Sequence, residues 1–450
     1  MDFKDKIFWL KNRLFRQHAI KLYKQAMQQQ WFSREQLNQL NWEKRKKIVE
    51  HAYNQIPFYH QYYNDCDFHP DHLKNEDDWS RVPVLEKQMI REHVSDMIDP
   101  TVDKKYLISS TTGGSTGIPL SVYHDKRFPY EFLGWRVQSW WDLSPGCHKA
   151  QVWRMSDAKK SLYGRLKDFV VWFPTRRVFI DASVLDERNI QRFIEKINKL
   201  RPEIILGYVG AIEQIALYAK RRQIAVTSPK FIWATSSPVS QVQKELFRQV
   251  FHCPVMDQYG SCEVMWIASN CPHNDNLHLY SDYRHVDILD ENDKMLPFGN
   301  MGNIAVSDLD NYAFPIIKYK NGDRGSLLAD TCPCGISLPL MSPVKGRESE
   351  CLQLPDNSMI AGDYLTTVFD DYTQYIEQFQ IVQKKDYSID INVVLNPQID
   401  SNVCLEKISD VEDTLVKRTK NQVPVRLIPV EQIPDDRGKI RYIISELSHN

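Results

Sequence analysis

Residues 203–259 alternate between short apolar runs and longer segments of helical periodicity, and this alternation limits the possible folds more than any other part of the chain. Strand, helix, strand, helix and strand in this order are typical of a parallel sheet with right-handed crossovers, which predicts an α/β fold. The expected strands are 203–208, 231–235 and 254–259, and the expected helices are 184–200, 211–222 and 239–251.

Small or polar residues follow each of these expected strands. Ligands bind parallel sheets beyond the carboxyl ends of the strands, and small residues let the backbone approach a ligand closely. We therefore expect a nucleotide at this edge, with Ser236 and Ser237 among its contacts. The three strand ends are Tyr208-Val209-Gly210, Ser236-Ser237-Pro238 and Tyr259-Gly260-Ser261.

The length of 450 residues predicts two or three domains. We expect a helical N-terminal segment of a large domain over 1–105, an α/β core with a β-rich subdomain over 106–346, and a small α+β domain over 347–450. Ser33 and Gln36 predict a capping box at the start of a helix over 33–55. Further strands are expected at 285–289, 302–306, 315–319, 387–395 and 423–430, and a further helix at 403–418.

The overall composition excludes several classes of function. A formal net charge of -1 gives no electrostatic reason to expect nucleic acid as a partner. The sequence shows neither a secretory signal nor an apolar stretch of about 20 residues, so we expect a cytoplasmic protein. Nine cysteines in that compartment are expected to be thiols or metal ligands. The oligomeric state stays open.

Residues 1–24 combine apolar and basic positions on a helical pattern. Phe3, Ile7, Leu10 and Leu14 share one face, and seven lysines and arginines surround them. Such a helix can associate peripherally with an anionic membrane surface, or it can pack on its own domain. Both alternatives stay open at this point.

The run Ser109-Ser110-Thr111-Thr112-Gly113-Gly114-Ser115-Thr116-Gly117-Ile118-Pro119 follows a short apolar segment. Its glycines let the chain wrap, while its hydroxyl and backbone N–H groups suit the phosphates of ATP. It is not a Walker A loop, because no Lys-Ser or Lys-Thr pair follows the glycines. A flexible surface loop is the alternative interpretation.

This run resembles the phosphate loop of the adenylate-forming enzymes, in particular the phenylacetate-CoA ligase branch and its CapK-type relatives in capsular polysaccharide synthesis. The resemblance extends through most of the chain in order. It includes Ala52-Tyr53 with Ile56-Pro57-Phe58-Tyr59, Tyr259-Gly260-Ser261-Cys262-Glu263, Tyr319 with Gly322-Asp323, Gly346-Arg347, and Arg437-Gly438-Lys439-Ile440-Arg441. It implies that the C-terminal domain is mobile about a hinge near Gly346-Arg347.

The resemblance also implies residue roles. Tyr259 offers a flat face to adenine, and Glu263 offers a hard oxygen to Mg²⁺. Asp323 accepts hydrogen bonds from the ribose hydroxyls, Arg347 reaches the ribose or a phosphate, and Lys439 brings positive charge to the reacting groups. The phosphate-loop contacts are Ser110, Thr112, Gly113, Gly114, Ser115, Thr116 and Gly117, and Gly260 and Ser261 complete the nucleotide site.

A second group of residues suits a structural zinc ion. Cys332-Pro333-Cys334 is a tight knuckle, and Cys271 lies upstream with His273 and His278 after it. Three thiolates and one imidazole make a closed tetrahedral site. The spacing does not choose between the two histidines, whereas the resemblance to a Cys, Leu-His and Cys-Pro-Cys pattern favours Cys271, His278, Cys332 and Cys334. Ordinary free thiols are the alternative.

We expect a CapK-like ligase that uses MgATP to adenylate a carboxylate, releases diphosphate, and couples the acyl group to an amine or hydroxyl acceptor. A set of arginines and tryptophans suits a sugar uronate, although core packing explains the same residues. An aryl-CoA ligase that uses coenzyme A and a non-catalytic nucleotide-binding scaffold are the alternatives. The set is Arg136, Trp140, Trp141, Trp153, Arg154, Trp172, Arg176 and Arg177.

Overall fold

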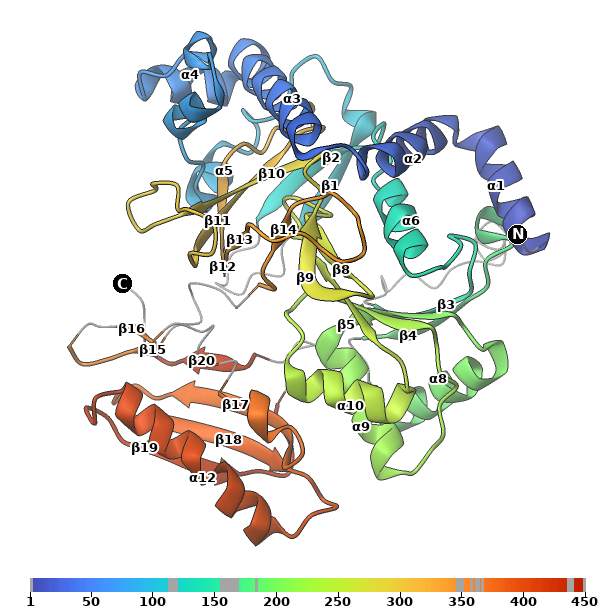
Figure 1. Cartoon of the computed structure of the whole chain (residues 1–450), viewed down its shortest axis with the longest axis vertical. Helices are drawn as coiled ribbons and strands as arrows, with labels where there is room; N and C mark the ends of the chain where they lie inside the picture. Colours follow the sequence, from blue (N-terminus) through green and yellow to red (C-terminus); the bar gives the residue numbers. More distant parts are fainter. Residues whose placement is uncertain are drawn as a thin grey trace. The chain divides into compact units, whose positions relative to one another are not determined.

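The computed structural model describes residues 3–111, 120–153, 170–182, 185–344, 352–356, 359–360, 365, 368–434 and 441–447 (Figure 1). The chain forms two compact units. The first unit comprises Met1–Phe8, Gly146–Asp257 and Lys345–Asn450, and the second unit comprises Trp9–Pro145 and Gln258–Val344. The architecture is a mixed α/β fold, as the alternation predicted.

Parallel strands form the centre of the first unit. Their order is β4-β3-β5-β6-β7, and every neighbouring pair in this order is parallel. Gly207 of β5 lets two strands approach, because an added Cβ would lie 2.4 Å from the Val152 carbonyl oxygen. The strands are β3 Lys149–Trp153, β4 Arg177–Asp181, β5 Ile204–Tyr208, β6 Phe231–Thr235 and β7 Val255–Tyr259.

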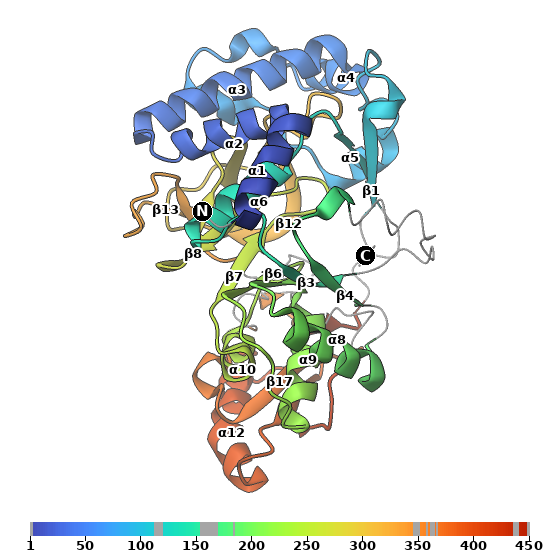
Figure 2. The ribbon, with the colours of Figure 1, turned by 90° about the vertical axis from the view of Figure 1, so that its right-hand side faces the viewer.

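Helices bury apolar faces against these strands. In the core, Ile205 and Ile232 of the sheet pack with Ile212, Phe247 and Phe251 of the helices. Figure 2 shows α9 and α10 side by side. The predicted alternation over 203–259 is confirmed, and the sheet gains two strands, β3 and β4, that the sequence pattern missed. The helices are α8 Glu187–Leu200, α9 Val209–Arg221 and α10 Gln241–Phe251.

The C-terminal part of the first unit has a four-stranded sheet in the order β19-β18-β17-β20. α12 lies across one face of this sheet (Figure 1). The strands predicted at 387–395 and 423–430 and the helix at 403–418 are confirmed, whereas β17 and β20 were missed. The elements are β15 Leu352–Gln353, β16 Met359–Ile360, η5 Asp370–Tyr372, β17 Ile376–Gln383, β18 Ile389–Leu395, α12 Ser401–Arg418, β19 Val425–Pro429 and β20 Ile443–Ser445.

Helices begin the second unit. The Ser33 Oγ accepts a hydrogen bond from the Gln36 N–H, and the Gln36 side chain accepts one from the Ser33 N–H, so the predicted capping box is confirmed. The described part of the apolar and basic segment, residues 3–24, lies in two helices that break at Arg16 rather than in one. The helices are α1 Phe3–Phe15, which spans the unit boundary, α2 Gln17–Gln29, α3 Arg34–Gln55, α4 Pro57–Asp65, η1 Pro70–His72, η2 Glu76–Arg81, α5 Lys87–His93, η3 Lys104–Tyr106 and α6 Glu131–Trp140.

Helix α1 is packed on one side and exposed on another. The Trp9 ring stacks on Tyr23 at a centroid distance of 5.1 Å, whereas Leu10 and Leu14 are exposed. Packing on the protein therefore explains part of the apolar pattern at the N-terminus. Among the described helices, none is both long and apolar enough to span a membrane.

Antiparallel strands complete the second unit, as the strand pattern predicted. The prediction of a strand at 315–319 is wrong, because β12 begins only at Tyr319. Lys318 adopts a left-handed φ of 48°, which ends extended backbone, and Pro315 has no N–H for a ladder. Sheet orders are β1-β2, β10-β11-β12 and β13-β14-β9-β8-β7. The strands are β1 Leu107–Thr111, β2 Ser121–Asp125, β8 Ala268–Cys271, β9 Asn274–Leu279, β10 Arg284–Leu289, β11 Gly302–Asp308, β12 Tyr319–Gly325, β13 Leu327–Leu328 and β14 Leu340–Met341.

Candidate functional site

The glycine-rich run lies between the strands β1 and β2. These strands pair antiparallel, with Ser110 of β1 opposite Val122 of β2. The predicted phosphate contacts Thr112, Gly113, Gly114, Ser115, Thr116 and Gly117 lie outside the described residues. The structure thus places Ser110 on the strand that leads into the run.

The segment after β7 makes a tight turn that carries Tyr259, Gly260, Ser261 and Glu263. The Ser261 N–H donates to the Val264 carbonyl oxygen at 3.0 Å, and the Val264 N–H donates to the Ser261 Oγ at 3.0 Å. Glu263 is buried, and its Oε1 accepts a hydrogen bond from the Tyr319 hydroxyl at 3.1 Å. A neighbouring tyrosine therefore orients this carboxylate.

The motif with Gly322 and Asp323 lies on β12, and its Asp323 contacts Tyr259. The Tyr259 hydroxyl donates to the Asp323 Oδ2 at 2.9 Å. Gly322 precedes Asp323 with a φ of 82°, a conformation that side chains other than glycine rarely adopt. The turn after β7 and the strand β12 are therefore joined twice, by Tyr259 with Asp323 and by Tyr319 with Glu263, although the two motifs are more than fifty residues apart in the sequence.

Asn321 belongs to this arrangement, and the sequence analysis did not single it out. Its Nδ2 donates to the Tyr259 hydroxyl at 2.7 Å and to the Asp323 Oδ2 at 3.0 Å, and its Oδ1 accepts from the Asp323 N–H at 3.0 Å. The Asn-Gly-Asp sequence is a turn signal that indicates the last contact. The contact with Tyr259 depends on tertiary structure and has no signal in the sequence.

A histidine ties the strand β2 to the turn that contains Glu263. The His124 Nε2 lies 2.8 Å from the Cys262 carbonyl oxygen, so this nitrogen carries the proton and donates. Burial lowers the pKa of His124, which keeps the imidazole neutral. The hairpin that flanks the glycine-rich run and the turn after β7 are thus held to each other within the second unit.

The other predicted nucleotide and catalytic residues are not among the described residues of the second unit. Ser236 and Ser237 follow β6 in the first unit, and Ser236 has a φ of 82°. Arg347 and Lys439 lie outside the described residues. Their predicted contacts with the ribose or a phosphate and with the reacting carboxylate stay predictions.

The cysteines and the histidine of the predicted zinc site lie together in the second unit. One ligand atom from each of Cys271, His278, Cys332 and Cys334 falls within 4.8 Å of the others. The Cys271 and Cys332 sulfurs are 3.5 Å apart, and the Cys334 sulfur is 3.4 Å from the His278 Nε2. The cluster comes from β8, β9 and the Cys332–Cys334 knuckle, and it includes His278 rather than His273.

The chemistry of this cluster suits a soft divalent cation. The His278 Nδ1 lies 3.4 Å from the Leu338 carbonyl oxygen, which leaves Nε2 facing the sulfurs. Burial lowers the pKa of His278 to about 4, so the imidazole is neutral and can ligate a metal. Burial also raises the pKa of Cys271 to about 12 and raises that of Cys334. Three sulfurs and one neutral nitrogen match the donor set of structural zinc.

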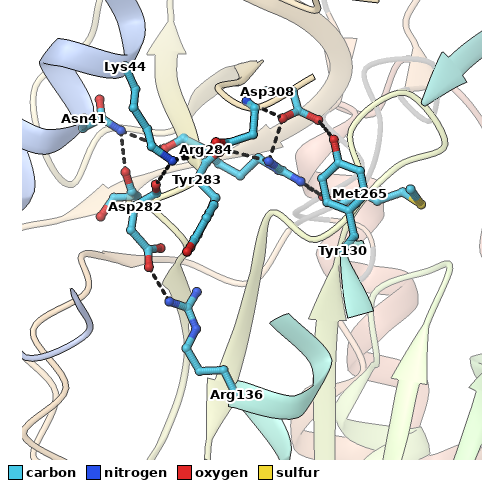
Figure 3. Close-up of polar contacts among 11 residues, drawn as sticks. Asn41, Lys44, Tyr130, Arg136, Met265, Asp282, Tyr283, Arg284 and Asp308 are labelled. Carbon is cyan, nitrogen blue, oxygen red and sulfur yellow. Dashed lines mark hydrogen bonds and ion pairs between the residues drawn. The ribbon is translucent and has the colours of Figure 1, made fainter. Parts of the chain in front are cut away.

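Three members of the predicted arginine–tryptophan set have structural contacts. Arg136 is fully buried, and its Nη1 lies 2.5 Å from the Asp282 Oδ2 (Figure 3). The Trp140 indole N–H donates to Gln30, and the Trp141 indole N–H points to the Asn270 carbonyl oxygen. Core packing is therefore the interpretation that fits these residues.

The remaining described members of the set are more exposed. Trp153 and Trp172 are partly exposed, and the Arg177 guanidinium lies 3.6 Å from the centre of the Trp172 ring. Arg176 lies just before β4 and is exposed, and Arg154 lies outside the described residues.

Solved structures of ligases share this fold. The chain superposes with a TM-score of 0.75 on a 2-hydroxyisobutyryl-CoA ligase in its postadenylation state, at 16% identity over 93% of this chain and 91% of the ligase. The amide bond synthetase McbA of Marinactinospora thermotolerans gives a TM-score of 0.51, at 15% identity over 74% of this chain and 68% of McbA. The fold is that of the adenylate-forming ligases.

Sequence comparison identifies the relatives within that class. Residues 352–446 match the CapK C-terminal domain family. The chain is 23% identical to protein CapK of Staphylococcus aureus over 73% of this chain and 72% of CapK. It is 20% identical to the phenylacetate-coenzyme A ligase of Thermus thermophilus over 91% of this chain and 97% of that ligase. The protein is thus homologous to CapK and to the phenylacetate-coenzyme A ligases, and a CoA ligase is also among its structural neighbours.

Proposed function

We propose that this protein is an ATP-dependent ligase that converts a carboxylic acid into its acyl adenylate. The observation that carries the proposal is a pair of buried carboxylates, each oriented by its own tyrosine hydroxyl: Asp323 by Tyr259, and Glu263 by Tyr319. A carboxylate that is held in place can accept hydrogen bonds from the ribose hydroxyls of ATP, which suits Asp323. A second one can ligate the magnesium ion, which suits Glu263.

In the proposed reaction, a carboxylate oxygen of the substrate attacks the α-phosphorus of ATP, and the bond to diphosphate breaks. Asp323 accepts hydrogen bonds from the ribose, and Tyr259 contacts the adenine. Glu263 is the residue that would hold Mg²⁺, which neutralises phosphate charge when it is bound. Lys439 supplies positive charge to the reacting carboxylate and α-phosphate, so the protein acts mainly through position and charge.

In the second step we propose that an amine or hydroxyl acceptor attacks the acyl carbon, AMP leaves, and the acceptor loses its proton. The match to the CapK C-terminal domain and the CapK homologue support a CapK-like function, which we propose to lie in capsular or exopolysaccharide synthesis, with a sugar uronate as the acid. Coenzyme A is the competing acceptor, because the phenylacetate-coenzyme A ligases are homologues too.

The cysteine–histidine cluster has a structural role in this proposal. We propose that Cys271, His278, Cys332 and Cys334 hold Zn²⁺, which ties β8 and β9 to the Cys332–Cys334 knuckle. All four positions belong to the protein, so a tetrahedral ion would have no open position for substrate.

Carboxylate-dependent diphosphate release tests the proposed function. A screen over uronates, amino acids and aryl acids, with and without coenzyme A, is expected to find an acid that supports release. Lys439→Ala is expected to lower this rate roughly 10²–10³-fold, because it removes charge stabilisation of the transition state. Lys407→Ala, at an exposed position of α12, is the matched control and should keep the full rate. ATP binding without carboxylate-dependent release by the wild-type protein would favour the non-catalytic scaffold.

A further inference from the structure

Asn321 uses both ends of its side-chain amide within the group of Tyr259, Asn321 and Asp323. The Nδ2 group donates to the Tyr259 hydroxyl at 2.7 Å and to the Asp323 Oδ2 at 3.0 Å. The Tyr259 hydroxyl donates in turn to the same Oδ2 at 2.9 Å, which closes a ring of three hydrogen bonds. A primary amide has two N–H donors, so one side chain satisfies both acceptors.

The other end of the amide acts on the backbone. The Asn321 Oδ1 accepts from the Asp323 N–H at 3.0 Å across Gly322, whose φ is 82°. This contact fixes the turn on which Asp323 stands, and the ring of hydrogen bonds fixes the direction of the Asp323 carboxylate. Asp323 is only 9% exposed, and Tyr259 only 8%, so water competes weakly for these contacts.

We propose that Asn321 is the positioning residue of the adenosine half of the site, and this inference rests on the proposed function. A ribose has two neighbouring hydroxyls, and a carboxylate accepts from both only when its plane is held in one orientation. Asn321 supplies that orientation from one side while it fixes the hydroxyl end of the Tyr259 ring on the other. The ligand class is a ribonucleotide with an intact 2′,3′-diol.

This role predicts a particular pattern of kinetic change. Asn321 acts on groups that bind the nucleoside, and the nucleoside is bound equally before and during the chemical step. Asn321→Ala is therefore expected to raise the KM for ATP roughly 10-fold while kcat changes less than about 2-fold. The preference of the enzyme for ATP over 2′-deoxy-ATP is expected to shrink by a similar factor, because the carboxylate no longer requires the second hydroxyl.

Two further variants separate the parts of the amide. Asn321→Asp keeps an oxygen that accepts from the Asp323 N–H, yet it replaces the donor with a second carboxylate beside Asp323. It is expected to retain the fold and to weaken ATP binding more than Asn321→Ala does. Asn300→Ala removes an exposed asparagine whose side chain donates to a nearby turn carbonyl, that of Pro297, and it should match the wild type.

The experiment is calorimetric titration of the full-length protein and its variants with ATP and with 2′-deoxy-ATP, together with initial rates of diphosphate release. Weaker ATP binding and lost discrimination in both Asn321 variants support the proposal. Wild-type affinity and wild-type discrimination in Asn321→Asp would overturn it, as would an equal loss of affinity for both nucleotides. The proposed function fails separately, if the wild-type protein itself binds no ATP or releases no diphosphate with any acid.

Discussion

Two buried polar regions of the second unit stabilise their charges in different ways. In the first region, Arg284 and Asp308 are fully buried, and their side chains are 2.7 Å apart (Figure 3). The Arg284 guanidinium also donates to the Met265 carbonyl oxygen, and the Tyr130 hydroxyl donates to Asp308. Cation, anion and neutral groups therefore satisfy one another inside the protein.

The cysteine–histidine cluster has no such balance among its own four ligands. Its sulfurs are potential anions, and its imidazole is neutral because burial lowers the pKa of His278. Each thiolate that forms beside another raises the electrostatic energy of both. The charges of Arg284 and Asp308 are thus paired within the protein, whereas we propose that the cluster is stabilised by a bound cation.

Removal of the proposed zinc site is expected to have the largest effect. Cys332→Ser removes one thiolate, and the zinc content of the purified protein should fall from about one ion per chain to less than a tenth of that. Structural zinc supplies on the order of 10 kcal/mol of binding free energy, so thermal unfolding should begin at a clearly lower temperature. Elemental analysis and calorimetry measure the two effects.

Cys66→Ser provides the control for this experiment, because Cys66 is an exposed cysteine outside the cluster. It should keep the zinc content and the unfolding temperature of the wild type. The metal site would be refuted if wild-type protein, purified under reducing conditions, contained no zinc and a chelator did not destabilise it. The contrast between the two regions would then be refuted as well.

Breaking the charge network is expected to have the next largest effect. Arg284→Met leaves Asp308 buried without its cation, and loss of one partner from a buried ion pair costs about 3–5 kcal/mol of unfolding free energy. Urea denaturation measures this loss. Arg222→Met, which breaks the exposed pair with Glu187, should cost less than about 1 kcal/mol. Equal losses in the two variants would mean that burial does not set the strength of these pairs.

The sequence predicted the elements whose pattern is local. The strands 231–235 and 204–208 and the helices after them have apolar runs and helical periodicity that are visible within about a dozen residues. β17 was missed because its buried positions include Glu377, Gln378 and Gln380, so no apolar alternation marks it. These polar side chains are buried for tertiary reasons, through contacts with residues such as Lys220 and Arg441 that lie far away in the sequence.

The site was predictable in residue type and less so in geometry. Tyr259, Glu263 and Asp323 were chosen through their motifs, and the structure brings them together. Asn321 was not chosen, because its contact with Tyr259 joins residues 62 positions apart. Likewise, Arg136 had the right chemistry for an anionic substrate, and only the fold reveals its buried partner Asp282.

Glu213 of α9 extends the comparison with a third way to bury an ionisable group. It is 1% exposed, and its Oε2 accepts a hydrogen bond from the Gln243 Nε2 at 2.8 Å. The side-chain amides of Gln243 and Gln378 are its hydrogen-bonding partners, and the charged group that acts on it, Glu377, is also negative. Burial raises the pKa of Glu213 from 4.5 to about 7, so a bound proton takes the place that an arginine or a metal ion has in the other two regions.

This difference predicts the direction of a pH effect. Between pH 4.5 and 7 the folded protein holds a proton on Glu213 that the unfolded chain releases. The stabilisation of the folded state by this bound proton is therefore complete below pH 4.5 and is lost as the pH rises to 7. Glu213→Gln accepts the same hydrogen bond and cannot ionise. At pH 8 this variant is expected to be more stable than the wild type by about 3 kcal/mol, and at pH 4.5 the two should agree.

Urea denaturation across this range measures the difference, with Glu195→Gln on an exposed position of α8 as the control. A constant difference between Glu213→Gln and the wild type at every pH would show that Glu213 is compensated by a charge, as Asp308 is, and not by a proton.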